Sequence, residues 1–102
     1  MRKLHVAAFV SLDGVMQAPG GPGEDDAGGF RFGGWIVPHA DETTGGAVGA
    51  LFHAQPALLL GRKTYDIFAG HWPKLAGDPF ADLINGMTKY VATRSPGPLD
   101  WA

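Results

Sequence analysis

The amino-acid sequence predicts an α/β protein with a mostly parallel sheet and helical crossovers. Three short runs rich in apolar residues predict strands at Leu4–Val10, Ala57–Leu60 and Lys89–Thr93, and the segments between them carry helix signals. Strands that alternate with helices favour a parallel sheet, because parallel neighbours need a long crossover connection. The length of 102 residues and the absence of an internal repeat predict a single domain over residues 1–102.

The N-terminal part is expected to contain one strand followed by a long loop. Leu4–Val10 is interrupted only by His5, which is typical of a strand that is buried on both faces. Turn-forming residues end it at Ser11–Gly14. Residues 18–34 are rich in glycine and proline and show no periodicity, so we expect either a functional lid or a floppy surface loop.

Three helices are predicted in the rest of the chain. The first starts at Asp41, whose side chain can cap it, and runs to about Ala54. The second runs from Arg62 to about His71, before Pro73, and a short third helix covers Pro79–Asn85. Val48, Leu51 and Phe52 would form the apolar face of the first helix, and Tyr65, Phe68 and Trp72 that of the second. The residues Ser95–Pro98 are typical of a turn.

Composition excludes several classes of function. The net charge of −2 and the lack of a basic patch argue against a nucleic-acid partner. The absence of cysteine excludes disulfides and thiol chemistry, and the four histidines lack the spacing of a metal site. No apolar run approaches the roughly 18 residues of a membrane span. We therefore expect a soluble cytoplasmic protein without a metal or a membrane partner.

The strongest functional signal is the run Gly61, Arg62, Lys63 and Thr64, where a predicted strand ends and a helix begins. The free N–H groups and the dipole of a helix start favour an anion, and two cations and a hydroxyl strengthen that preference. Glycine permits close approach of the backbone. The run predicts a phosphate site, and the competing interpretation is a solvated basic helix start.

Two further groups follow predicted strands. Thr93, Arg94 and Ser95 come directly after the last strand, at the sheet edge where parallel α/β proteins bind ligands. A guanidinium between two hydroxyls suits a phosphomonoester such as the 2′-phosphate of NADP, although a solvated turn is the simpler interpretation. Asp13 follows the first strand and could orient a substrate or relay a proton, or act only as a turn residue.

The order and spacing of these motifs resemble one family over residues 3–101. The shared series comprises Ser11-Leu12-Asp13-Gly14, Leu60-Gly61-Arg62-Lys63-Thr64-Tyr65, Trp72-Pro73, Asn85 and Lys89-Tyr90-Val91-Ala92-Thr93-Arg94-Ser95. It resembles the reductase domain of riboflavin biosynthesis and its stand-alone relatives, the dihydrofolate reductase family proteins.

The resemblance implies a dihydrofolate reductase-like fold and NADPH as the hydride donor. Carried over by position, the residues Gly61–Thr64 would hold the phosphates of the cofactor, and Thr93, Arg94 and Ser95 would hold its adenosine end. Ala8 would lie near the nicotinamide, and Asp13, as the catalytic candidate, would face the substrate.

True dihydrofolate reductases carry a pterin-binding carboxylate shortly after a Trp-x-x-Pro motif. Here Trp35 begins such a motif and Asp41 follows it at a loose spacing. Trp35 and Asp41 are therefore substrate-binding candidates, with helix capping as the competing role of Asp41. The expanded loop and the Ser11–Gly14 signature favour the riboflavin-type relatives.

The sequence departs from the family in length, since family members run to nearly twice its size. We expect a truncated domain: a fragment, a shortened reading frame, or one part of an exchanged homodimer. The predicted function is reduction of a small heterocycle, pterin-like or pyrimidine-like, with NADPH. The alternative is a nucleotide-binding or assembly module without catalysis.

Overall fold

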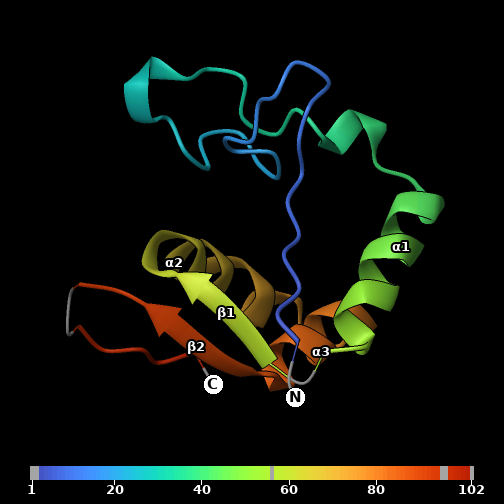
Figure 1. Cartoon of the computed structure of the whole chain (residues 1–102), viewed down its shortest axis with the longest axis vertical. Helices are drawn as coiled ribbons and strands as arrows, with labels where there is room; N and C mark the ends of the chain where they lie inside the picture. The colour runs from blue at the N-terminus through green and yellow to red at the C-terminus, as the bar shows by residue number, and fades with distance from the viewer. Residues whose placement is uncertain (1–2, 56, 95–96, 102) are drawn as a thin grey trace. The chain divides into compact units, whose positions relative to one another are not determined.

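The sheet of this α/β structure consists of two parallel strands in the part of the chain that the computed structural model describes, residues 3–55, 57–94 and 97–101. The chain divides into two compact units, Met1–Asp41 and Glu42–Ala102. The second unit contains α1 (Glu42–His53), β1 (Ala57–Gly61), α2 (Arg62–His71), the 3₁₀ turn η3 (Trp72–Leu75), α3 (Pro79–Gly86) and β2 (Thr88–Ala92) (Figure 1). The predicted helices and the last two strands are therefore confirmed, with ends that differ by one residue at most.

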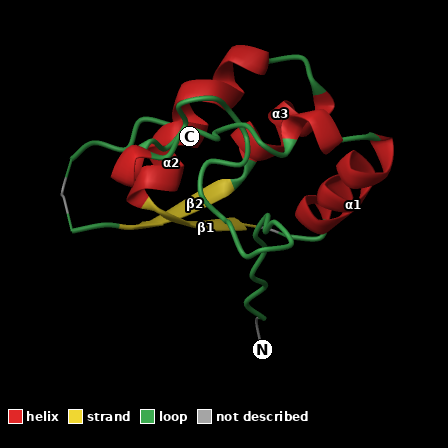
Figure 2. Cartoon of the chain, turned by 90° about the horizontal axis from the view of Figure 1, so that it is seen from above, coloured by secondary structure: helices red, strands yellow, loops and turns green. Residues whose placement is uncertain are grey.

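The two strands pair in register from Ala57 opposite Thr88 to Gly61 opposite Ala92. Such a parallel pair requires a crossover, and α2, η3 and α3 supply it. Figures 1 and 2 show α2 lying over one face of the strands, with which it is in contact.

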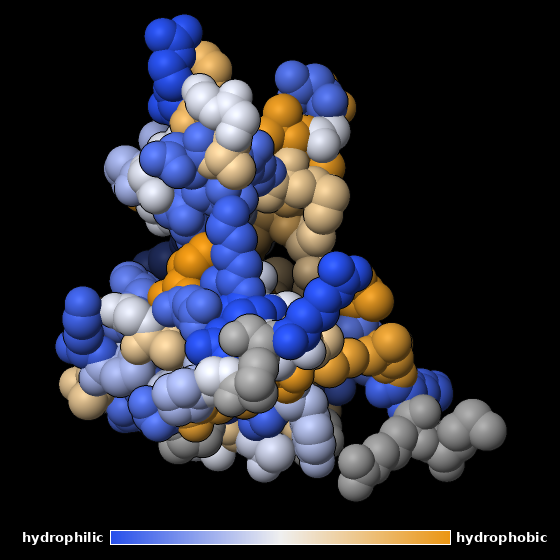
Figure 3. All heavy atoms as spheres, turned by 90° about the vertical axis from the view of Figure 1, so that its left-hand side faces the viewer, coloured by the Kyte–Doolittle hydropathy of each residue, from blue (hydrophilic) through white to orange (hydrophobic). Residues whose placement is uncertain are grey.

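The two faces of the sheet differ in exposure. Leu58, Leu60 and Val91 are half-buried, as expected for side chains that face α2. On the opposite face Leu59 is 62% exposed and Tyr90, its partner across the strands, is 55% exposed. The helices of this unit therefore cover only one face of the two strands. Figure 3 shows further apolar side chains, in orange, at the molecular surface.

The core of the second unit gathers around α3. Ala81 and Ile84 of this helix and the neighbouring Met87 are buried, as is Tyr65 of α2. Asp78 caps α3 by accepting a hydrogen bond of 3.0 Å from the N–H of Ala81. Edge-to-face aromatic contacts join α3 to its neighbours: the Phe80 ring lies 5.4 Å from Phe52 of α1 and 5.2 Å from Trp72 of η3. Aromatic packing thus fixes α1 and η3 against α3.

The first unit has little regular structure, and the strand predicted at Leu4–Val10 is wrong. This segment has no regular secondary structure, and Leu4 and Val6 are 73% and 88% exposed. An apolar run becomes a strand only when a neighbouring strand completes its hydrogen-bond ladder. The described sheet pairs β1 with β2 alone, so the run remains irregular.

The predicted loop at residues 18–34 is confirmed, interrupted by the 3₁₀ turn η1 (Ala27–Gly29) and followed by η2 (Val37–His39). Its ends are held together: the N–H of Gly34 donates to the carbonyl of Ala18 at 2.8 Å. A Cβ at Gly33 would lie 2.7 Å from the carbonyl oxygen of Gly21, so glycine is required for this close approach. The loop is therefore packed against itself.

Candidate functional site

The carboxyl ends of β1 and β2 bring two predicted groups to one edge of the sheet. The strands are parallel and Gly61 lies opposite Ala92, so α2 begins where Thr93 and Arg94 follow β2. Phosphate candidates that are about 30 residues apart in sequence therefore share this edge, which is where open parallel sheets bind ligands. Ser95, the last predicted member, lies outside the described residues.

Gly61 forms the N-cap of α2 and leaves room above its backbone. Its φ of −72° is available to any residue, so conformation does not require glycine here. A Cβ built at this position would meet open space. The missing side chain therefore leaves the first N–H groups of α2 accessible to a ligand.

The cations and hydroxyls around this helix start differ in how they are held. Lys63 and Thr64 are exposed in the first turn of α2, and Arg94 is exposed after β2. Because these side chains are exposed, they can contact an anion without disrupting buried contacts. Because a helix start also attracts negative charge through its dipole, the edge suits phosphate groups.

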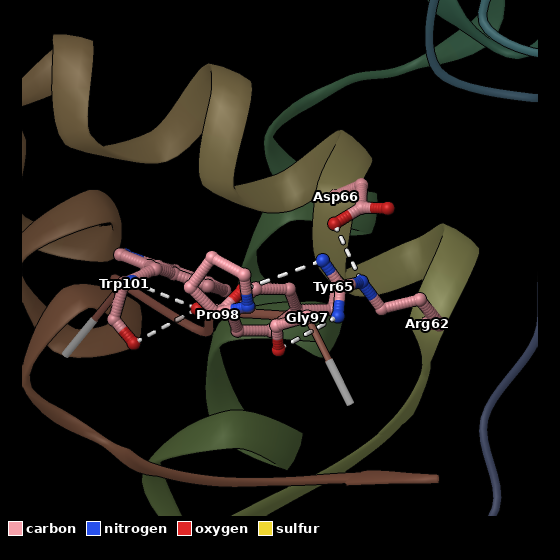
Figure 4. Close-up of polar contacts among 6 residues, drawn as sticks. All are labelled: Arg62, Tyr65, Asp66, Gly97, Pro98 and Trp101. Carbon is pink, nitrogen blue, oxygen red and sulfur yellow. Dashed lines mark hydrogen bonds and ion pairs between the residues drawn. The ribbon is translucent and has the colours of Figure 1, made fainter. Parts of the chain in front are cut away.

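Arg62 is held by its own chain, which sequence reasoning did not predict. Its Nε donates to Oδ1 of Asp66 at 3.0 Å, one helical turn further along α2. Its Nη1 and Nη2 donate to the carbonyl oxygens of Gly97 and Pro98 at 3.4 and 3.3 Å (Figure 4). The i,i+4 spacing of Arg62 and Asp66 is a sequence signal for the first contact, whereas no local pattern indicates the other two.

The four remaining candidates belong to the first unit. Ala8 is exposed in the irregular segment, and Asp41 is exposed directly before α1. Trp35 is half-buried, and its indole Nε1 donates to the carbonyl of Gln17 at 2.8 Å. This bond holds the ring against the loop, so Trp35 has a structural role within its unit.

Asp13 lies in the turn that follows the irregular segment and is fully exposed. The hydroxyl of Ser11 donates to its Oδ1 at 2.5 Å, and this hydrogen bond lowers the pKa of Asp13 below its ordinary value. The same hydroxyl accepts from the N–H of Val15 at 2.8 Å. The lowered pKa favours the ionised carboxylate and makes it a weaker proton acceptor, so Asp13 suits a cation or a hydrogen-bond donor.

Substitution of Ser11 by alanine is expected to raise the pKa of Asp13, because the ionised form loses its hydrogen bond. A carboxyl group whose pKa is lowered by folding stabilises the folded state at pH values above its unfolded pKa. This stabilisation is lost as the pH falls through the folded pKa. The stabilising contribution of Asp13 at neutral pH should therefore shrink in the variant. An NMR titration of the side-chain carboxyl carbons checks this, with the other aspartates as internal controls. An unchanged Asp13 titration would contradict the assignment.

None of the described helices combines the length and the apolar composition that a membrane crossing requires. Within residues 3–55, 57–94 and 97–101, no three histidine, aspartate or glutamate side chains are grouped as a metal site would need. The described residues combine a parallel crossover with a helix start whose charge suits anions, and this arrangement belongs to the α/β class.

Comparison with known proteins identifies the family. The chain belongs to the RibD C-terminal domain family, whose model matches residues 2–101. The family is a reductase-type domain of riboflavin biosynthesis with a dihydrofolate reductase-like fold, and the parallel strands and helices of the second unit are consistent with it. The predicted family and fold class are confirmed. No curated protein matches the chain.

Proposed function

We propose that the chain binds NADPH and uses it to reduce a small heterocyclic substrate of pterin-like or pyrimidine-like chemistry. One observation carries the proposal: the start of α2 and the residues after β2 share the carboxyl edge of a parallel sheet. Membership of a reductase-type family supports it independently.

In the proposal, different residues at this edge bind different phosphate groups of the cofactor. The open backbone at Gly61, with Lys63 and Thr64, would hold the pyrophosphate. Arg94, exposed after β2, would bind the 2′-phosphate, which distinguishes NADPH from NADH. Arg62 would join the phosphate site once it leaves its present partners.

When bound, NADPH supplies the hydride, so the chain needs no nucleophile of its own. Its side chains would orient the reactants. Asp13, as the carboxylate candidate, would accept a hydrogen bond from the substrate or take up a proton. Ala8 near the nicotinamide and Trp35 and Asp41 near the substrate complete the proposal by resemblance to the family.

A second candidate is a nucleotide-binding or assembly module without catalysis. The contacts of Arg62 with Asp66, Gly97 and Pro98 favour the assembly role, because they occupy a cation that a nucleotide would use. Cofactor binding without oxidation of NADPH, across a panel of pterins and pyrimidines, would distinguish this candidate from a reductase.

The direct test measures NADPH and NADH binding through quenching of tryptophan fluorescence. We expect NADPH to bind more tightly, since only NADPH carries the 2′-phosphate. Equal affinity for the two cofactors would remove the role of Arg94, and the absence of binding to the folded chain would refute the proposal.

We also propose that the chain assembles as a homodimer. Leu59 and Tyr90 face each other on an exposed sheet face, and apolar side chains at such a face are commonly covered by a second copy. Light scattering should give about twice the 10.7 kDa of one chain. Leu59→Lys, which places a charge on this face, should shift the mass toward the monomer, whereas a cooperative monomer of the unaltered chain would contradict the proposal.

A further inference from the structure

The residues Gly97–Trp101, here named the latch, turn back toward the start of α2. Figure 4 shows the carbonyl oxygens of Gly97 and Pro98 accepting from the guanidinium of Arg62, while Asp66 accepts from its Nε. Each of the three guanidinium nitrogens therefore donates one hydrogen bond to a protein oxygen, which uses three of the five N–H groups. The side chain of Arg62 is only 29% exposed in this arrangement.

Tyr65 anchors the end of the latch. Its hydroxyl accepts from the N–H of Trp101 at 2.7 Å and donates to the carbonyl of the same residue at 3.2 Å. Tyr65 is 3% exposed, and its ring lies 5.8 Å from the indole of Trp101. A single buried hydroxyl thus satisfies both backbone groups of one residue that is 36 positions away in sequence.

The indole of Trp101 has two anchors of its own. Its Nε1 donates to Oδ1 of Asn85 at 2.8 Å. The ammonium of Lys89 lies 4.0 Å from the ring centre, within the range of a cation–π contact, and donates to the carbonyl of Asn85 at 2.9 Å. The latch is therefore fixed at its end by side chains of α2, α3 and β2.

The latch also forms one wall of a partly open pocket of about 350 Å³. Leu99 and Trp101 line it from the latch, and Tyr65 and Lys89 line it from α2 and β2. Release of the latch would remove this wall of the pocket and free Arg62 in the same movement, so the two events are coupled by geometry.

We propose that the latch and a phosphate group compete for Arg62, so that the latch controls how strongly the start of α2 binds an anion. The inference rests on the proposed function, because it requires the phosphate site there. A guanidinium that donates to Gly97 and Pro98 cannot direct the same N–H groups at a ligand. The apparent affinity for the anion is therefore the affinity of the open form multiplied by the fraction of molecules in which Arg62 is released.

The test uses variants that weaken the latch and leave the phosphate candidates intact. Tyr65→Phe removes both hydrogen bonds to Trp101 and keeps the ring, and Trp101→Ala removes the indole anchors. Tyr90→Phe is the matched control, since it removes the same hydroxyl from an exposed residue of β2. Inorganic pyrophosphate and NADPH serve as ligands, and calorimetry gives the dissociation constants.

Both latch variants should bind pyrophosphate and NADPH about three- to tenfold more tightly than the wild type, and Tyr90→Phe should bind as the wild type does. When Arg62 is also replaced by alanine, Trp101→Ala should no longer increase the affinity for either ligand, because the latch acts through Arg62. Titration of the ¹⁵N-labelled wild type should move the indole N–H resonance of Trp101 as Arg62 changes partners.

Two failures are distinguishable. Equal affinity of the wild type and both latch variants, with an unmoved Trp101 resonance, would overturn the latch and leave the cofactor site standing. No binding by any folded variant would overturn the proposed function together with the latch. If Tyr65→Phe does not fold, Trp101→Ala decides, because its side chain is only partly buried.

Discussion

Substitution of Arg94 by alanine is expected to weaken NADPH binding by about 1.5–3 kcal/mol, or roughly 10- to 150-fold. Arg94 follows β2 at the edge where α2 begins, and its side chain is exposed. A guanidinium that binds the 2′-phosphate makes charge-assisted hydrogen bonds that alanine cannot replace. Calorimetric titration of both chains with NADPH measures the loss.

Three controls accompany this prediction. NADH lacks the 2′-phosphate, so Arg94→Ala should hardly change its affinity. Arg31→Ala removes an exposed arginine to which the proposal gives no role, and should leave NADPH binding unchanged. The unliganded Arg94→Ala chain should melt as the wild type does, because the side chain is exposed. A large fall in Tm would show a structural role for Arg94.

Substitution of Ile84 by alanine is expected to lower the free energy of unfolding of the second unit by about 2–5 kcal/mol. Ile84 is 1% exposed on α3, beside the helix positions that meet α1 and η3. The loss combines the transfer of three carbon atoms with the cavity that they leave. A marginally stable chain of this size would lose a large share of its stability.

Urea unfolding followed by circular dichroism measures this effect. Leu12→Ala is the matched control, because it removes a similar apolar volume from a side chain that is fully exposed. We expect the control to change stability by less than about 0.5 kcal/mol. Equal losses in the two variants would show that α3 does not form the core of its unit.

The elements of the second unit could be predicted because their signals are local. Asp78 and Pro79 mark the start of α3, and the leucine run between Pro56 and Gly61 limits β1 to a strand's length. The order of strands and helices then favours a parallel pair, so the shared edge at Gly61 and Thr93 also followed from the sequence.

Other features depended on contacts between distant residues. The apolar run Leu4–Val10 has the composition of a strand, yet strand formation depends on a hydrogen-bonding neighbour, which composition does not specify. The exposure of Leu59 and Tyr90 depends likewise on which faces other elements cover. Periodicity indicates that a side chain can be buried and does not indicate what buries it.

By itself, the sequence determined the α/β class, the family, and the cation-bearing helix start at Arg62, Lys63 and Thr64. These follow from chain order, spacing and residue chemistry, which need no tertiary contact. Only the tertiary structure decided that Arg62 donates to Asp66, Gly97 and Pro98, and that Tyr65 anchors Trp101. Most of these hydrogen bonds join residues about 35 positions apart, and their partners are backbone groups that every residue carries. A sequence pattern cannot distinguish one backbone carbonyl from another, so folding alone selects the partner of a side-chain donor.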